Sequence, residues 1–165
     1  AVTWFAQGIL PLIRARRPAA KFVIVGRAPT AAVTRLAGLP GVSVTGEVAD
    51  VRGWLAAAAV AVAPLKLARG VQNKVLEAMA MARPVVVSAA AAKGIDHGGT
   101  ILVGQDADQL ADRVVGLLAD PTAAAELGAR ARDRVVSRYG WAATLAPLDA
   151  IVGLEAGAIP QRNAA

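Results

Sequence analysis

The sequence has 165 residues, which suits one domain with a substantial core, and its formal net charge is +6. Apolar residues make up 56% of the chain and aromatic residues only 4%, a composition that suits helices packed closely on a sheet. The absence of cysteine excludes a disulfide scaffold, a thiolate metal site and a cysteine nucleophile, and it fits a reducing compartment. The arginines are scattered and no nucleic-acid-binding motif accompanies them, so we expect no nucleic-acid partner.

Short apolar strands alternate with helices along the sequence. The apolar runs predict strands over residues 21–26, 42–46, 60–65, 84–88 and 100–103. The helical spacing of apolar residues predicts helices over residues 4–17, 30–39, 51–58, 71–82, 107–119, 122–139 and 141–154. Pro11 falls within the first helix, so we expect this helix either to be kinked or to begin later. Thr30 and Asp50 are candidate N-caps, and Pro121 suits the first turn of its helix.

Strands that alternate with helices imply parallel pairing, with helices on both faces of the sheet. We therefore predict an α/β fold, a Rossmann-like three-layer domain with a mainly parallel sheet over residues 1–155, followed by a flexible tail at 156–165. Such a domain normally opens with its central strand, whereas this sequence opens with a helix, so we expect the first strand to be missing before Ala1. Ligands of these sheets lie beyond the carboxyl ends of the strands, which here are residues 27–29, 47–50, 66–70 and 89–94.

The helix predicted after the third strand combines an apolar side with a polar one. Val75, Leu76 and Met79 form the apolar side, while Asn73 and Glu77 are four residues apart and share one face. This polar pair suits a ligand that offers hydroxyl groups, since a carboxylate accepts hydrogen bonds from a ribose diol. The alternative is a solvated helix face without a ligand, which the spacing alone leaves open.

The start of this helix suits an anion. No Ser, Thr or Asp caps it, so its first N–H groups are free, and Gly70 lets a ligand approach the backbone. Lys66, Arg69 and Lys74 surround this point, although Lys66 is better explained as an ordinary surface cation. The pattern thus predicts a diphosphate at the helix start, with Glu77 accepting hydrogen bonds from sugar hydroxyls.

Other residues have less specific explanations. His97 lies in a glycine-rich turn without a partner for metal binding, so it receives no role. The arginines of residues 130–138 form a solvated helix face or, alternatively, contact anionic lipid. No Gly-rich dinucleotide fingerprint and no Walker loop is present. The predicted strands at 42–46 and 60–65 also end without the acidic residue that a phosphorelay receiver needs.

One longer stretch resembles a known family. Residues 70–81 read Gly-Val-Gln-Asn-Lys-Val-Leu-Glu-Ala-Met-Ala-Met, and residues 83–87 read Arg-Pro-Val-Val-Val. Together they resemble the donor-site segment of family 4 (group 1) glycosyltransferases, which have the two-domain GT-B fold. The similarity runs from Trp4 to about Val152 and is closest to sugar transferases linked to bacterial exopolysaccharide and protein-sorting systems.

The resemblance implies that the chain is the C-terminal, donor-binding half of a retaining glycosyltransferase. The donor is then a UDP- or GDP-sugar, the acceptor a glycan or a lipid-linked acceptor, and no metal or other cofactor is expected. The acceptor-binding N-terminal domain is a missing partner, so this half alone binds donor without transferring it and holds no catalytic residue. We expect a cytoplasmic protein, with peripheral association at the inner face of the membrane as a further option. The alternative is a non-catalytic binding or assembly module of the same fold.

The resemblance also implies roles for individual residues. Glu77 matches the family's second glutamate, which binds the nucleotide ribose, and Arg69 stands where the first glutamate contacts the donor sugar. Gly70 and Val71 match the backbone beside the donor phosphates, and Val48 lies in the loop that flanks the base. The predicted substrate-binding set is completed by Gln72, Asn73 and Lys74.

Overall fold

The computed structural model describes residues 1–141, 143 and 145. Its strands are β1 (Phe22–Val25), β2 (Val42–Gly46), β3 (Ala61–Ala63), β4 (Val85–Ser88) and β5 (Leu102–Gly104). Its helices are α1 (Val2–Trp4), η1 (Phe5–Ile9), α2 (Leu10–Arg16), α3 (Ala31–Thr34), η2 (Arg35–Gly38), α4 (Arg52–Ala57), α5 (Asn73–Ala80), α6 (Ala89–Ala92), α7 (Ala107–Ala119) and α8 (Pro121–Tyr139). The predicted helix at 141–154 and the predicted tail lie outside the described residues, apart from residues 141, 143 and 145, which are helical.

The first helix is continuous from Val2 to Arg16 but changes its winding on the way. Residues Phe5–Ile9 form a π-helix, and Pro11 follows in the first turn of α2. Proline has no N–H to donate and its ring collides with the carbonyl one turn back, so the helix widens ahead of it. The disturbance expected from Pro11 is therefore a π-turn.

Two predicted helix starts need correction, and one short helix is not predicted. Thr30 is the N-cap residue of α3, but its side chain makes no capping hydrogen bond, and α3 passes into the 3₁₀-helix η2 instead of continuing to residue 39. Val51 is the N-cap residue of α4, although the Asp50 carboxylate still accepts from the Arg52 N–H at 2.8 Å. The sequence pattern does not predict the short helix α6, which Ser88 caps by accepting from the Ala91 N–H.

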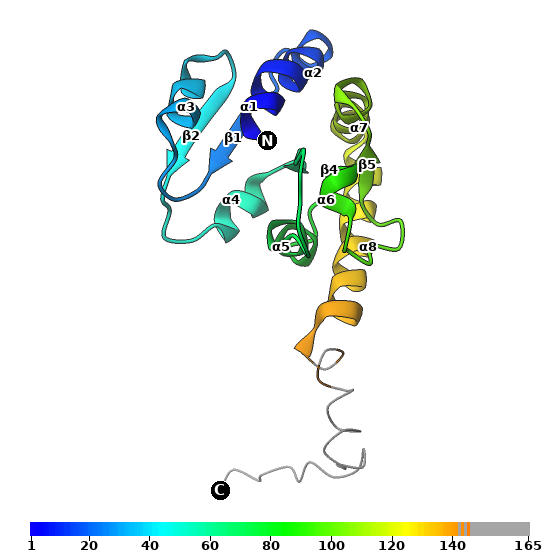
Figure 1. The fold of residues 1–165 in the computed structure, drawn as a ribbon. Coiled ribbons are helices and arrows are strands. Elements are labelled where there is room, and N and C mark those ends of the chain that lie inside the picture. The colour runs from blue at the N-terminus through cyan, green and yellow to red at the C-terminus, as the bar shows by residue number, and fades with distance from the viewer. Residues whose placement is uncertain (142, 144, 146–165) are drawn as a thin grey trace, which may run out of the picture.

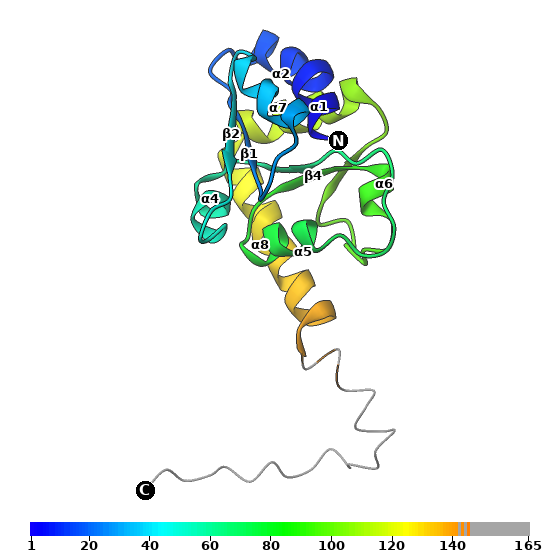
Figure 2. The same cartoon turned by 60° about the vertical axis from the view of Figure 1, so that its left-hand side comes forward.

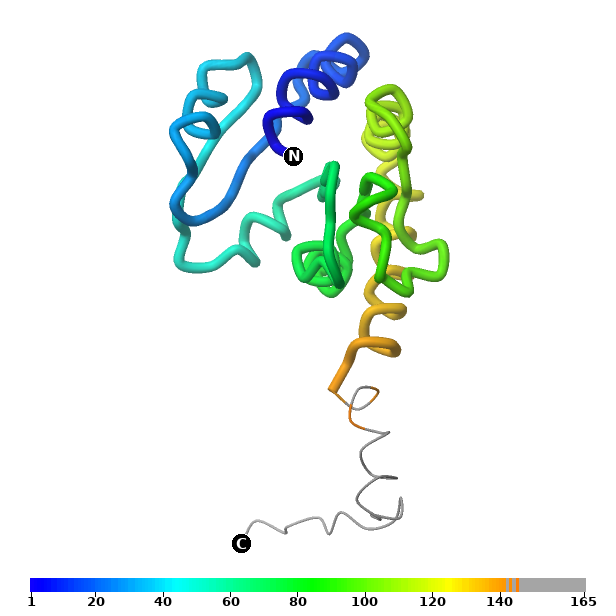
Figure 3. Tube along the Cα trace, in the orientation of Figure 1, coloured from blue at the N-terminus to red at the C-terminus, as the bar shows by residue number. Residues whose placement is uncertain are grey.

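The strands form two parallel sheets. β1 pairs with β2, and β4 lies between β3 and β5 in a separate three-stranded sheet. In Figure 1 the two sheets stand apart, with β1 and β2 on the left and β4 and β5 on the right. The tube in Figure 3 follows the chain through residues 47–60 as it crosses from one sheet to the other. The predicted single sheet is thus divided, because no described strand pairs with both β1 and β3.

Helices cover both faces of the three-stranded sheet, as predicted. Figure 2 shows α1, α2 and α7 on one side of β4 and α5 and α8 on the other. The side chains of β4 alternate between the two faces of the sheet: Val86 belongs to one buried cluster, and Val85 and Val87 belong to a second. All four β4 residues are buried, as a strand covered on both faces should be.

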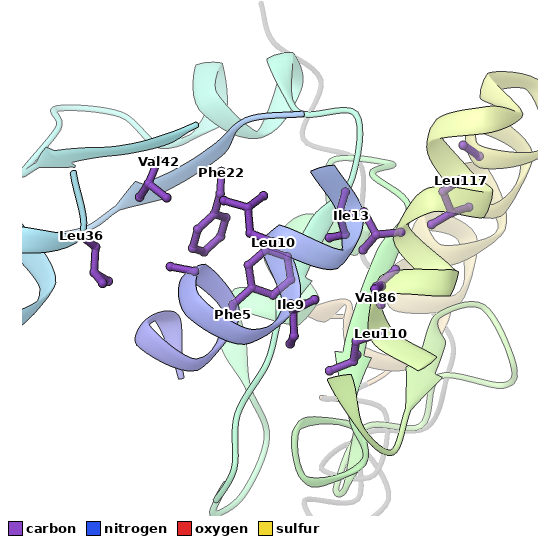
Figure 4. Close-up of a cluster of buried hydrophobic side chains, with 14 of the residues drawn as sticks. Phe5, Ile9, Leu10, Ile13, Phe22, Leu36, Val42, Val86, Leu110 and Leu117 are labelled. Atoms are coloured by element: carbon purple, nitrogen blue, oxygen red, sulfur yellow. The ribbon is translucent and has the colours of Figure 1, made fainter. Parts of the chain in front are cut away.

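The first buried cluster joins the two sheets through side chains. Figure 4 shows Ile9 and Leu10 of the first helix between Phe22 of β1 and Val86 of β4. The rings of Phe5 and Phe22 lie 4.5 Å apart between centroids, tilted by 42°. Ile9 is completely buried. The first helix therefore packs against both sheets.

Candidate functional site

The carboxyl ends of β3 and β4 are tied together by one buried polar residue. Ser88, 6% exposed at the end of β4, donates from Oγ to the carbonyl of Leu65 at 2.5 Å. The same Oγ accepts from the Ala91 N–H at 3.3 Å. Leu65 leads directly into residues 66–72, which we call the 66–72 loop and which connects β3 to α5. Ser88 therefore helps to hold the backbone of Leu65 in place just before the 66–72 loop.

Helix α5 begins without a side-chain cap, as the sequence predicts. Its N-cap residue is Gln72, whose side chain makes no capping hydrogen bond. The Gln72 carbonyl accepts from the N–H groups of Val75 and Leu76 at 2.9 and 3.3 Å. No hydrogen bond among the described residues uses the N–H groups of Asn73 and Lys74. These two donors and the positive end of the helix dipole suit an anion.

Glu77 lies on the solvent side of α5, one turn from Asn73. Both residues are exposed, whereas Val75 and Met79 on the other side are 1% and 0% exposed. No hydrogen bond or ion pair among the described residues involves the Glu77 carboxylate. A carboxylate in this position can accept two hydroxyl donors from a ligand at the helix start. The predicted division of α5 into apolar and polar sides is thus confirmed.

The 66–72 loop presents its backbone to solvent at Gly70. Gly70 has φ +65°, and a Cβ built there would have no atom within 4 Å, so the space in front of it is open. Arg69 and Val71 are exposed on either side. The Gln72 side chain folds back on the loop, because its Nε2 donates to the carbonyls of Arg69 and Gly70, each at 3.2 Å. Gln72 therefore shapes the loop.

Lys66 lies beside the first helix of the chain. It is exposed, and its ammonium lies 5.4 Å from the centroid of the Trp4 ring, within the range of a cation–π contact. Trp4 and Lys66 are far apart in the sequence, so no local pattern indicates this contact. An open hollow of about 480 Å³ lies here, lined by Ala1, Thr3, Trp4, Gln7, Gly8 and Lys66.

Val48 follows a strand of the other sheet than the remaining predicted site residues do. It is half-buried in the loop after β2, whereas residues 69–74 and 77 follow β3. The neighbouring Asp50 also accepts from the Arg52 guanidinium, at 3.0 and 2.9 Å. These hydrogen bonds lower the pKa of the exposed Asp50 carboxyl. The Asp50 carboxylate therefore binds the first residue of α4.

Two further observations concern metals and membranes. Within residues 1–141, 143 and 145, no group of three or more His, Cys, Asp or Glu side chains could hold a metal ion. In the same part of the chain, no helix is both long and apolar enough to cross a bilayer.

Several solved structures share this fold. HepE of Anabaena, solved with UDP, is 20% identical, has a TM-score of 0.70, and matches 92% of this chain and 46% of its own. Sucrose-phosphate synthase of Thermosynechococcus elongatus is 28% identical, with a TM-score of 0.70 over 88% of this chain and 41% of its own. A glycosyltransferase of Rickettsia africae is 16% identical, with a TM-score of 0.70 over 90% and 45%. The chain thus spans less than half the length of each of these proteins.

Sequence comparison gives the family directly. No curated protein sequence matches the chain. The family model for "Glycosyl transferases group 1" matches residues 1–120, which is well over half of the sequence. This match agrees with the fold shared with the solved glycosyltransferase structures. The chain belongs to the group 1 glycosyltransferases.

Proposed function

We propose that the chain is the donor-binding domain of a retaining glycosyltransferase and binds a nucleoside-diphosphate sugar at the 66–72 loop and the start of α5. The observation that carries this proposal is the set of groups at one helix end. The N–H groups of Asn73 and Lys74 have no partner among the described residues, Gly70 faces open space, and Glu77 is exposed one turn further on. HepE, which shares the fold, has been solved with UDP and with UDP-glucose.

Most of the predicted residues have a role in this proposal. The diphosphate accepts hydrogen bonds from the N–H groups at the start of α5, and Lys74 adds positive charge. Gly70 and Val71 let the phosphates approach the backbone, while Glu77 accepts the ribose hydroxyls. Arg69 directs a guanidinium toward the diphosphate or an acidic sugar. The helix end and these cations can neutralise the phosphates, so the proposal requires no metal.

The transfer itself requires a second domain. In this proposal the acceptor, a glycan or a lipid-linked acceptor of surface polysaccharide synthesis, binds to an N-terminal domain. The donor then lies between the two domains, and the chain described here binds donor without turning it over.

Calorimetry with UDP and GDP at low salt tests the proposal. We expect one nucleotide to bind, and we expect Glu77→Gln to weaken that binding about tenfold to a hundredfold, since hydrogen bonds to a charged group contribute about 1.5–3 kcal/mol. Glu126→Gln is the matched control, because Glu126 is an exposed glutamate on α8. Binding of neither nucleotide, by this chain or by a two-domain chain that contains it, would contradict the proposal.

A further inference from the structure

Asp96 is held by α8 through all of its polar groups. It lies between α6 and β5, and its carboxylate accepts from the Arg134 guanidinium and from Arg138 Nε, the latter at 2.6 Å. Its N–H donates to the Tyr139 hydroxyl at 2.7 Å, and its carbonyl accepts from Arg134 Nε at 3.1 Å. We call these four residues the Asp96 clamp.

The clamp is charged at neutral pH. Hydrogen bonds from Arg134 and then Arg138 lower the pKa of the Asp96 carboxyl, so the carboxylate stays ionised. The preceding residue, Ile95, is 6% exposed and packs in the second buried cluster. The backbone at residues 95 and 96 is thus held both by charge and by apolar packing.

The clamp reaches the 66–72 loop through Gly94, two residues before Asp96. Gly94 has φ +83°, and a Cβ built there would lie 3.5 Å from the carbonyl oxygen of Gly70. The backbone at Gly94 is therefore a close neighbour of the backbone at Gly70, with room between them for no more than a methyl group. Within the described part of the chain, the side-chain hydrogen bonds to Arg69 and Gly70 both come from Gln72 of the same loop. Gly94 is therefore a neighbour of this part of the loop that lies outside the loop itself.

We infer that the Asp96 clamp positions the backbone of Gly70 for the donor diphosphate, which makes Asp96 a positioning residue. This inference rests on the proposed function for its effect on ligand, but not for its effect on the loop. In this inference, breaking the clamp leaves Ile95 as the remaining anchor of the segment, so that the backbone at Gly94 confines Gly70 less tightly.

Nitrogen-15 relaxation of the 165-residue chain tests the inference with Asp96→Asn. We expect backbone order parameters at residues 69–71 to fall below their wild-type values, toward the range below about 0.6 that marks flexible backbone. We expect UDP affinity to fall about fivefold, because the loosened backbone at Gly70 must be ordered again when the diphosphate binds. Asp112→Asn is the matched control, because it breaks the exposed Arg16–Asp112 ion pair elsewhere on the molecule.

The outcomes separate the two proposals. Order parameters at residues 69–71 that stay at the wild-type value in Asp96→Asn would overturn the clamp. An equal fall in Asp112→Asn would also overturn it, because the effect would then be general. If neither the wild-type chain nor a two-domain chain that contains it binds UDP or GDP, while only Asp96→Asn loosens the loop, the proposed function fails and the clamp stands.

Discussion

Replacing Ser88 with alanine removes the polar tie between β3, β4 and α6. The lost N-cap contributes about 0.5–2 kcal/mol, and the lost hydrogen bond to the Leu65 carbonyl about 0.5–1.5 kcal/mol. Both contacts are at the buried end of β4. We therefore expect Ser88→Ala to destabilise the fold by about 2 kcal/mol, which lowers Tm by roughly 4–8 °C for a chain of this size.

Thermal denaturation and UDP titration measure the two consequences. Ser137→Ala is the control, because the exposed Ser137 hydroxyl donates only to the Arg134 carbonyl of its own helix. A surface change of this kind is expected to cost less than about 0.5 kcal/mol. Ser88→Ala should also weaken UDP binding, since Leu65 leads into the 66–72 loop. If the two variants lose the same Tm, the structural reasoning about Ser88 is refuted.

Four other substitutions give sharp expectations. Gly128→Ala should destabilise the fold by about 1–3 kcal/mol, because a Cβ at this position would overlap the Ala82 carbonyl. Gly116→Ala on α7 should be neutral or stabilising, because a Cβ there would have no atom within 4 Å. The denaturant midpoints of the two variants test this difference. Ala82→Gly should stabilise by up to about 1 kcal/mol, because Ala82 has φ +53° just after α5; an unchanged midpoint would contradict this. Arg69→Ala should weaken binding of UDP but not of uridine, as measured by calorimetry; equal losses would show that Arg69 does not address the phosphates.

Local pattern is sufficient for most of the secondary structure. The strand at 42–46 and the helix at 107–119 have the predicted bounds. Each combines a strong apolar pattern with a clear stop or cap, such as the Asp106 carboxylate that accepts from the Gln109 N–H. Helix α6 is not predicted, because a run of four alanines is equally compatible with a packed connection, and its Ser88 cap also ends a strand.

The candidate site is predictable only where its parts are adjacent in sequence. Asn73 and Glu77 share a helix face, so their spacing is enough to place them together. The ties that support the site cross long distances in sequence: Ser88 contacts a residue 23 positions away, and Tyr139 contacts one 43 positions away. A single sequence carries no local signature for such pairs.

The division of the sheet has a consequence for donor recognition. Among the described residues, no backbone hydrogen bond joins the β1–β2 half to the β3–β5 half, and side-chain packing around Ile9 connects them instead. Packed helices slide over one another more readily than paired strands do. Val48 and the start of α5 stand on opposite halves, so in the proposed donor complex the distance between the nucleobase contact and the diphosphate contact is set by how these halves pack. A smaller side chain at Ile9 would then alter which nucleotides fit, in addition to lowering stability.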